Sequence, residues 1–210
     1  MDIAVINIKG QETGKKVSIP DLLSESTPND HTIWLDVKHY LAAQRQGTHK
    51  AKEKSEMAYS TKKIKKQKGT GGARAGSLKS GVFVGGGRIF GPRPRDYSFK
   101  LNKKVKQLAR RSAIAYKLKD NSLIFLEDFS LIAPKTKEFG AILRTLNLDS
   151  SKTLFLLAGS DSLKNISLSS RNLPNAKVIN VSDLNTYEIM NAEKLVIGEN
   201  ALETLIDLIS

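Results

Sequence analysis

Between Gly47 and Asp96 the sequence has no helical or strand periodicity that lasts more than a few residues. Ten of the chain's 15 glycines lie between Arg45 and Arg111. A stretch of fifty residues without secondary structure is far longer than the ordinary loops of a compact domain. Such a stretch is either functional or disordered, and the rest of the chain has to fold around it.

The same region carries most of the chain's positive charge. The segment from Arg45 to Arg111 holds twenty of the 34 basic residues but only three of the 21 acidic ones, a net charge of +17, while the rest of the chain carries −4. The protein is therefore a mildly acidic one with an intensely basic insert, and this asymmetry indicates a polyanionic partner.

The basic insert has too few apolar side chains to fold by itself. Fixing one residue's backbone costs about 1–2 kcal/mol, and burying one large apolar side chain returns about 1.5–3 kcal/mol. Over some fifty residues the bulky apolar side chains are seven: Ile64, Leu78, Val82, Phe83, Val84, Ile89 and Phe90. We therefore expect the insert to be ordered only by a partner.

Residues 1–46 and 97–210 predict a single globular α/β domain, with residues 47–96 as an extended loop. After a strand over 2–8, a possible short strand over 16–19 and helices over 30–46 and 100–119, short apolar strands alternate with amphipathic helices. Four such strands are expected over 122–127, 153–158, 176–180 and 194–197, with helices over 136–146, 161–168, 183–190 and 200–209. This rhythm predicts a three-layer domain with a mostly parallel sheet of about four strands.

Several protein classes are excluded. The sequence has no cysteine, so disulfides and thiolate metal sites cannot form, and its three histidines have no partner at a metal-ligand spacing. The first residues lack the pattern of a signal peptide, and no run of about 18 apolar residues could span a membrane. We expect a cytoplasmic protein with no metal, no cofactor and no membrane partner.

A doubly wound nucleotide-dependent enzyme is the main alternative, because ligands of open α/β sheets bind beyond the carboxyl ends of the strands. Acidic residues do follow three predicted strands, at 127–128, at 161 and at 199. However, the glycine clusters over 69–74, 76–82 and 85–91 lack the full motif of a phosphate-binding loop between a strand and a helix. No residues supply a base and a nucleophile together, so we expect that the protein is not an enzyme.

RNA is the polyanion that the basic insert fits best. Glycine lets the backbone approach a sugar-phosphate chain closely, while Lys and Arg neutralise phosphates. Duplex DNA is usually read by a rigid helix, so a flexible ribbon favours a folded RNA. The candidate RNA-binding residues are Arg45, Lys50, Lys62, Lys63, Lys65, Lys66, Lys68, Arg74, Lys79, Arg88, Arg93, Arg95, Lys100, Lys103, Lys104, Arg110 and Arg111.

Ordered motifs along the chain resemble a known family. They are Arg45-Gln46-Gly47-Thr48, Gln67-Lys68-Gly69-Thr70-Gly71 with Ala73-Arg74 and Gly76-Ser77, Gly85-Gly86-Gly87 before Phe90-Gly91-Pro92-Arg93-Pro94-Arg95, Asn102-Lys103-Lys104, and Ala133-Pro134-Lys135-Thr136-Lys137. Through them the chain resembles the family of large-subunit ribosomal protein four in its bacterial form, over essentially its whole length. Such ordered clusters are highly specific.

The resemblance implies a structural protein that lies on large-subunit rRNA, supports subunit assembly and threads its loop into the RNA. It implies that the loop tip reaches the narrow part of the nascent-peptide exit tunnel beside ribosomal protein twenty-two, where it would meet the nascent peptide. The tip would consist of Gln67, Lys68, Gly69, Thr70, Gly71, Gly72, Ala73 and Arg74. A free RNA-binding regulator is a further alternative that the sequence leaves open.

Two tip positions depart from the family pattern. The family often has an aromatic residue where this chain has Lys65, and an arginine where it has Gly72. Contacts of the tip with rRNA can therefore differ in detail from those of other members.

Overall fold

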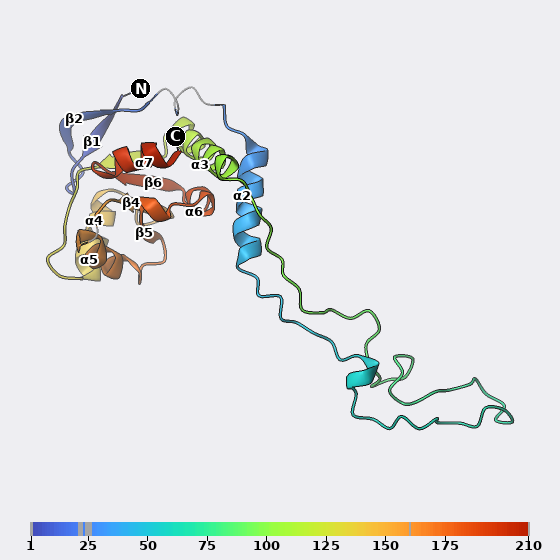
Figure 1. Cartoon of the computed structure of the whole chain (residues 1–210). Coiled ribbons are helices and arrows are strands. Elements are labelled where there is room, and N and C mark those ends of the chain that lie inside the picture. The colour runs from blue at the N-terminus through green and yellow to red at the C-terminus, as the bar shows by residue number, and fades with distance from the viewer. Residues whose placement is uncertain (1, 21–22, 24–26, 160, 210) are drawn as a thin grey trace. The chain divides into compact units, whose positions relative to one another are not determined.

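The computed structural model describes residues 2–20, 23, 27–159 and 161–209, although not the side chains of residues 161 and 162. The chain divides into two compact units, one of residues 1–41 and 100–210 and one of residues 42–99. The first is an α/β unit, and the second is an irregular loop (Figure 1). Each is described below by itself.

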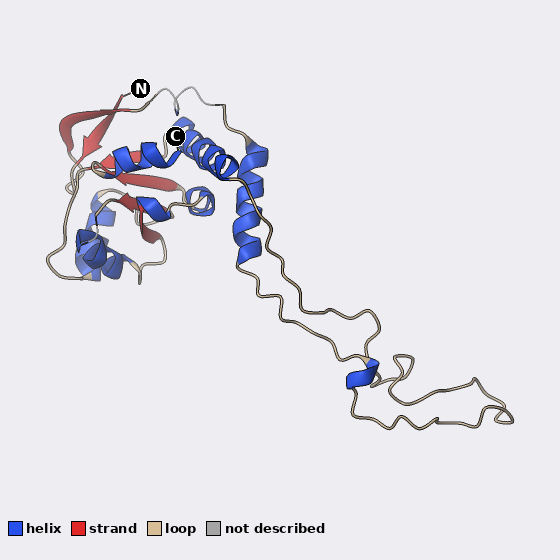
Figure 2. Cartoon of the chain, in the orientation of Figure 1, coloured by secondary structure: helices blue, strands red, loops and turns tan. Residues whose placement is uncertain are grey.

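Among the described residues, six strands form one mixed sheet in the order β2-β1-β3-β6-β4-β5 (Figure 2). The strands are β1 (Asp2–Ile6), β2 (Glu12–Ser18), β3 (Leu123–Leu126), β4 (Thr153–Leu157), β5 (Ala176–Asn180) and β6 (Lys194–Gly198). All neighbouring pairs are parallel except β1 and β2. The central strands β4 and β6 are almost wholly buried, which explains their continuous apolar sequences.

The expected sheet of about four strands is too small. The N-terminal hairpin joins the same sheet, because Val5 of β1 pairs in parallel with Phe125 of β3. The hairpin turn is also shorter than expected: the Asn7 side chain accepts hydrogen bonds from the backbone N–H groups of Lys9 and Gln11, so β2 already begins at Glu12.

Helices cover both faces of the sheet, so the expected three layers and α/β class are confirmed (Figure 1). On one face, α2 (Asp30–Ala43), α3 (Lys103–Lys119), α6 (Thr186–Asn191) and α7 (Ala201–Ile209) contribute to a core around Phe125, Leu156 and Ile197. On the other, α4 (Thr136–Thr145) and α5 (Asp161–Ser170) pack on Phe155 and Val196.

Three helix boundaries differ from expectation by three residues. Helix α2 ends at Ala43 rather than at residue 46, α3 begins at Lys103 rather than at residue 100, and α6 begins at Thr186 rather than at residue 183. Asn185 caps α6, since its side-chain oxygen accepts the backbone N–H of Glu188 at 2.8 Å. Residues Val181–Asp183 instead form a short 3-10 helix.

A buried polar contact ties α2 to α6. The Thr186 hydroxyl donates to the Asp36 carboxylate at 2.5 Å, and both residues are buried. Because an unpaired buried carboxylate is costly, this bond fixes which face of α2 turns inward. None of the described helices is both long and apolar enough to cross a membrane.

A substitution at Phe155 tests the core that α4 and α5 form with the sheet. Its ring is fully buried on β4 and meets the ring of Phe139 edge to face, with centroids 5.4 Å apart. Phe155→Ala should therefore lower the free energy of unfolding by about 3–5 kcal/mol, as measured by urea denaturation. The control Ile132→Ala removes a fully exposed side chain and should change it by less than about 0.5 kcal/mol. Equal losses for both variants would contradict this core.

Candidate nucleic-acid interface

The loop of residues 42–99 has almost no regular structure. Apart from the last residues of α2, the 3-10 helix η1 (Lys54–Glu56) is the one helix in this range, all of which the structure describes, and the range contains no strand. One leg of the loop runs out to the predicted tip and the other runs back. The two legs are joined by backbone hydrogen bonds from Arg95 to Gly47, Ala51 to Pro92, Arg88 to Lys52 and Ile64 to Gly76. The legs are therefore paired, but irregularly.

A cluster of arginines around one tyrosine closes the base of the loop, which we call the neck (residues 45–49 and 95–97). The guanidinium groups of Arg45 and Arg95 lie 4.1 and 4.5 Å from the centre of the Tyr97 ring. The Tyr97 hydroxyl lies 3.2 Å from Nε2 of His49. These cation–π contacts hold both legs to one aromatic ring.

Gly47 is required for the neck. Its φ is +66°, and a Cβ at this position would lie 2.1 Å from the Arg95 carbonyl oxygen. Any side chain would therefore be strained in its backbone and would also collide with the other leg. The sequence predicts Gly47 only as the residue that ends the helix over 30–46, and does not indicate the close approach to the Arg95 carbonyl.

The loop has no hydrophobic core of its own. Val84 and Phe90 are fully exposed, Val82 is 83% exposed, and Ile64, Leu78 and Ile89 are between 41 and 59% exposed. Apolar burial therefore contributes little to holding this segment in one conformation.

Acidic side chains neutralise only a small part of the loop's charge. Residues 42–99 contain fourteen basic and three acidic residues. Lys50 pairs with Glu56, and Arg93 pairs with Glu53 at 2.5 Å. The Lys50 ammonium and the Glu53 backbone lower the pKa of Glu56, and hydrogen bonds from Ser98 lower the pKa of Asp96, so these two carboxylates stay charged at neutral pH.

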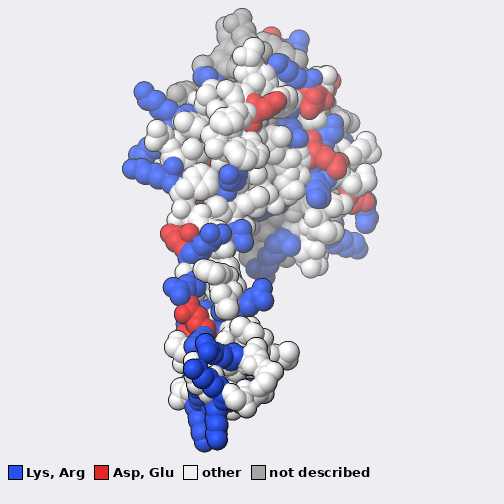
Figure 3. Space-filling view, turned by 90° about the vertical axis from the view of Figure 1, so that its right-hand side faces the viewer, with Lys and Arg blue, Asp and Glu red and all other residues white. Residues whose placement is uncertain are grey.

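The predicted tip consists entirely of exposed residues. Every residue from 67 to 74 is exposed, and Gly69 and Gly71 have positive φ. Lys63 donates a hydrogen bond to Gln67, and Lys65 Nζ reaches toward Gly72. In Figure 3 Lys and Arg side chains gather on the loop, in the lower part of the view.

The other predicted contact residues are of two kinds. The candidate residues numbered from 45 to 95 belong to the loop. Of the others, Lys100 precedes α3, and the residues within α3 are Lys103, Lys104, Arg110 and Arg111. Lys103 and Lys104 are exposed. Arg110 and Arg111 are half-buried, and their Nε atoms have no hydrogen-bond partner among the described residues.

Two acidic residues at the strand ends, Asp128 and Glu199, make structural contacts. Asp128 accepts a hydrogen bond from the backbone N–H of Asn200 at the start of α7, 3.1 Å away. Glu199 pairs with Lys15 at 2.9 Å, and this hydrogen bond raises the pKa of Lys15. Ser160 and the side chain of Asp161 lie outside the part of the chain that the structure describes.

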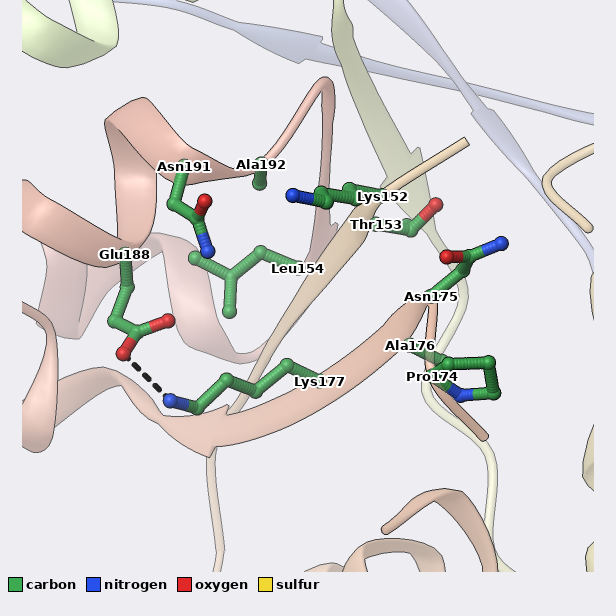
Figure 4. Close-up of a pocket in the computed structure, with 10 residues that line it drawn as sticks. All are labelled: Lys152, Thr153, Leu154, Pro174, Asn175, Ala176, Lys177, Glu188, Asn191 and Ala192. Carbon is green, nitrogen blue, oxygen red and sulfur yellow. Dashed lines mark hydrogen bonds and ion pairs between the residues drawn. The ribbon is translucent and has the colours of Figure 1, made fainter. Parts of the chain in front are cut away.

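A pocket of about 230 Å³ lies at the amino ends of strands β4 and β5, opposite to their carboxyl ends (Figure 4). It is lined by Thr153 and Ala176, the first residues of β4 and β5, and contains an ion pair between Lys177 and Glu188 at 2.5 Å. Doubly wound enzymes bind ligands at the carboxyl ends of the strands, so this pocket is at the wrong end for a nucleotide. Within the described residues, no three His, Asp or Glu side chains are grouped as metal ligands.

Comparisons with known proteins give one consistent match. Residues 17–208 match the model of the ribosomal protein L4/L1 family. The chain is 60% identical over 205 residues to the large ribosomal subunit protein uL4 of Cytophaga hutchinsonii, covering 98% of each protein. It is 57% identical to that of Christiangramia forsetii, over 97% of each, and 51% identical to that of Phocaeicola vulgatus over the full length of both.

Gly47 provides a test of the neck. Gly47→Ala should separate the legs, because the new Cβ collides with the Arg95 carbonyl. We expect faster trypsin cleavage after Arg45 and Arg95 than in the unchanged protein. Gly14→Ala is a matched control, since Gly14 also has a positive φ of 75° but no atom within 4 Å of the added Cβ. If Gly47→Ala were cleaved no faster than this control, the close approach at the neck would be wrong.

Proposed function

The chain belongs to the ribosomal protein L4/L1 family, and from this premise we propose that it binds large-subunit rRNA through the loop and the start of α3. Its relatives are named as proteins of the large ribosomal subunit. The protein is accordingly a structural component of the bacterial large subunit in the cytoplasm, and it is not an enzyme.

The net charge of the loop is the observation that carries this proposal. Fourteen basic against three acidic residues give residues 42–99 a charge of +11, without a core that would order them. Releasing the counterions of RNA phosphates provides a driving force that needs no apolar burial. RNA therefore supplies what the loop's own sequence lacks.

The exposed tip indicates which part of the loop would enter the RNA. Residues 67–74 carry two cations and three glycines, and no acidic residue occurs between Glu56 and Asp96. Such a tip can enter a narrow space lined by phosphates. By family resemblance we propose that it reaches the peptide exit tunnel, beside ribosomal protein twenty-two and the nascent peptide, and that the protein supports subunit assembly.

Exposed cations continue along the sequence from the loop into α3. Lys103 and Lys104 stand in the first turn of α3, directly after the loop, and both are exposed. Arg110 and Arg111 are half-buried, so we expect them to contribute less to binding than the lysines.

A set of charge variants tests whether the loop binds RNA. Replacing Lys62, Lys63, Lys65, Lys66 and Lys68 with Ala should weaken filter binding to large-subunit rRNA. Each phosphate contact adds about 0.7–0.9 to the magnitude of the slope of log affinity against log salt, so loss of five contacts should reduce that magnitude by about 3.5 to 4.5.

The control variant replaces five exposed cations of the α/β unit: Lys9, Arg144, Lys152, Lys164 and Arg171. It changes the net charge equally and should leave the slope nearly unchanged. If both variants changed the slope by the same amount, binding would depend on net charge alone, and the loop would not be the RNA-binding element.

A further inference from the structure

We propose that Phe90 is a nucleobase-stacking residue, which receives one unpaired base of the RNA on its ring. Lys54, Arg88 and Arg93 would hold the phosphates on either side of that base. This inference rests on the proposed function and assigns a specific chemistry to one point of the loop. The sequence identifies Phe90 as one of the few apolar residues of the insert and as part of a family motif, but assigns it no contact of its own.

The backbone at Phe90 is in a conformation that a phenylalanine rarely adopts. Its φ is +51°, in the left-handed region, where the Cβ of a bulky residue crowds the backbone. Glycine would adopt this φ without strain. The chain nevertheless has an aromatic residue here, and strained positions of this kind occur mostly at functional sites.

The strained backbone does not bring the Phe90 ring into a packing contact within the protein. Phe90 is 103% exposed, so its ring is open to solvent rather than packed on the loop. A flat apolar ring that is fully exposed can stack on a base of any identity, because every base has a π face.

The backbone around Phe90 is attached to the opposite leg on both sides. Two residues before it, the Arg88 N–H donates to the Lys52 carbonyl at 2.8 Å. Two residues after it, the carbonyl of Pro92 accepts the Ala51 N–H at 3.1 Å. These bonds position Phe90 between two fixed points, as a stacking residue requires.

The surroundings of Phe90 fit a nucleotide. It borders a hollow of about 630 Å³ that also contains Lys54, Arg88, Arg93 and Glu53. This volume is within the range of about 300–1,000 Å³ for small-molecule sites. Arg93 is paired with Glu53, so three cations and one anion leave a net positive charge beside the ring.

A protein partner fits this position less well. The exposed aliphatic residues of the same loop, Val82 and Val84, could enter an apolar protein pocket, but Lys54 and Arg88 would then be buried beside an apolar surface that offers them no anion. Phosphates of an RNA strand satisfy these cations while a base covers the ring. The observations therefore favour RNA.

The test compares four variants by filter binding to large-subunit rRNA over a range of salt. Phe90→Ala should weaken binding about five- to 150-fold, the loss measured for stacking residues, without changing the salt slope. Phe90→Trp should bind as the unchanged protein does. Phe90→Leu should lose nearly as much affinity as Phe90→Ala, because it keeps apolar surface but has no ring.

Val84→Ala is the matched control, since Val84 is an equally exposed apolar residue of the same loop, and it should not change affinity. Full affinity of Phe90→Ala or Phe90→Leu would overturn the stacking role, as would equal losses for Phe90→Ala and Val84→Ala. These failures differ from failure of the proposed function, in which the unchanged protein itself would bind rRNA without a steep salt slope.

A cross-linking measurement distinguishes the two classes of partner. A photoreactive p-azidophenylalanine in place of Phe90 would be irradiated in intact large subunits. A cross-link to rRNA supports the inference, and a cross-link to another protein overturns it.

Discussion

The shape of the loop has to be reached without a hydrophobic core and against electrostatic repulsion. Residues 42–99 carry fourteen basic and three acidic residues, and most of their large apolar side chains are exposed. Charges on the two legs repel each other over the Debye length of about 10 Å at 0.1 M salt. Pairing of the legs therefore depends on backbone hydrogen bonds and on the aromatic neck, and rRNA bound as we propose would remove the repulsion.

These contacts are not evenly distributed along the loop. All three acidic residues lie at positions 53, 56 and 96, where they pair with Lys50 and Arg93 or accept hydrogen bonds from Ser98. Gly87 is buried there too, and a Cβ on it would lie 2.5 Å from the Lys54 nitrogen, so only glycine permits this approach of the legs. Between residues 57 and 95 the chain has ten basic residues and no acidic one. The half nearer the neck is thus held largely by the protein, and the half nearer the tip has more to gain from RNA.

The α/β class, the three layers and the four central strands could be predicted because buried parallel strands appear as continuous apolar runs, such as residues 154–157. The hairpin of β1 and β2 was recognised, but sequence alternation does not say which strand it joins; that depends on pairing between Val5 and Phe125, 120 positions away. The basic loop could be located because charge is a sum over residues. The cation–π contacts of Arg45 and Arg95 with Tyr97 and the strained φ of Phe90 could not be predicted, since both arise from contacts across the loop.

The α/β unit can carry this loop at little cost to its own stability. The entropy of closing a loop grows only as the logarithm of its length, about 0.6 kcal/mol for each doubling. The helices before and after the loop are meanwhile fixed by buried residues, such as Ile33 on α2 and Ile114 on α3. If the loop binds rRNA as we propose, the cost of ordering it is met at binding rather than when the α/β unit folds, and it is subtracted from the binding free energy. A loop ordered in this way would need more phosphate contacts than a rigid surface of equal affinity, and the number of its lysines and arginines fits that need.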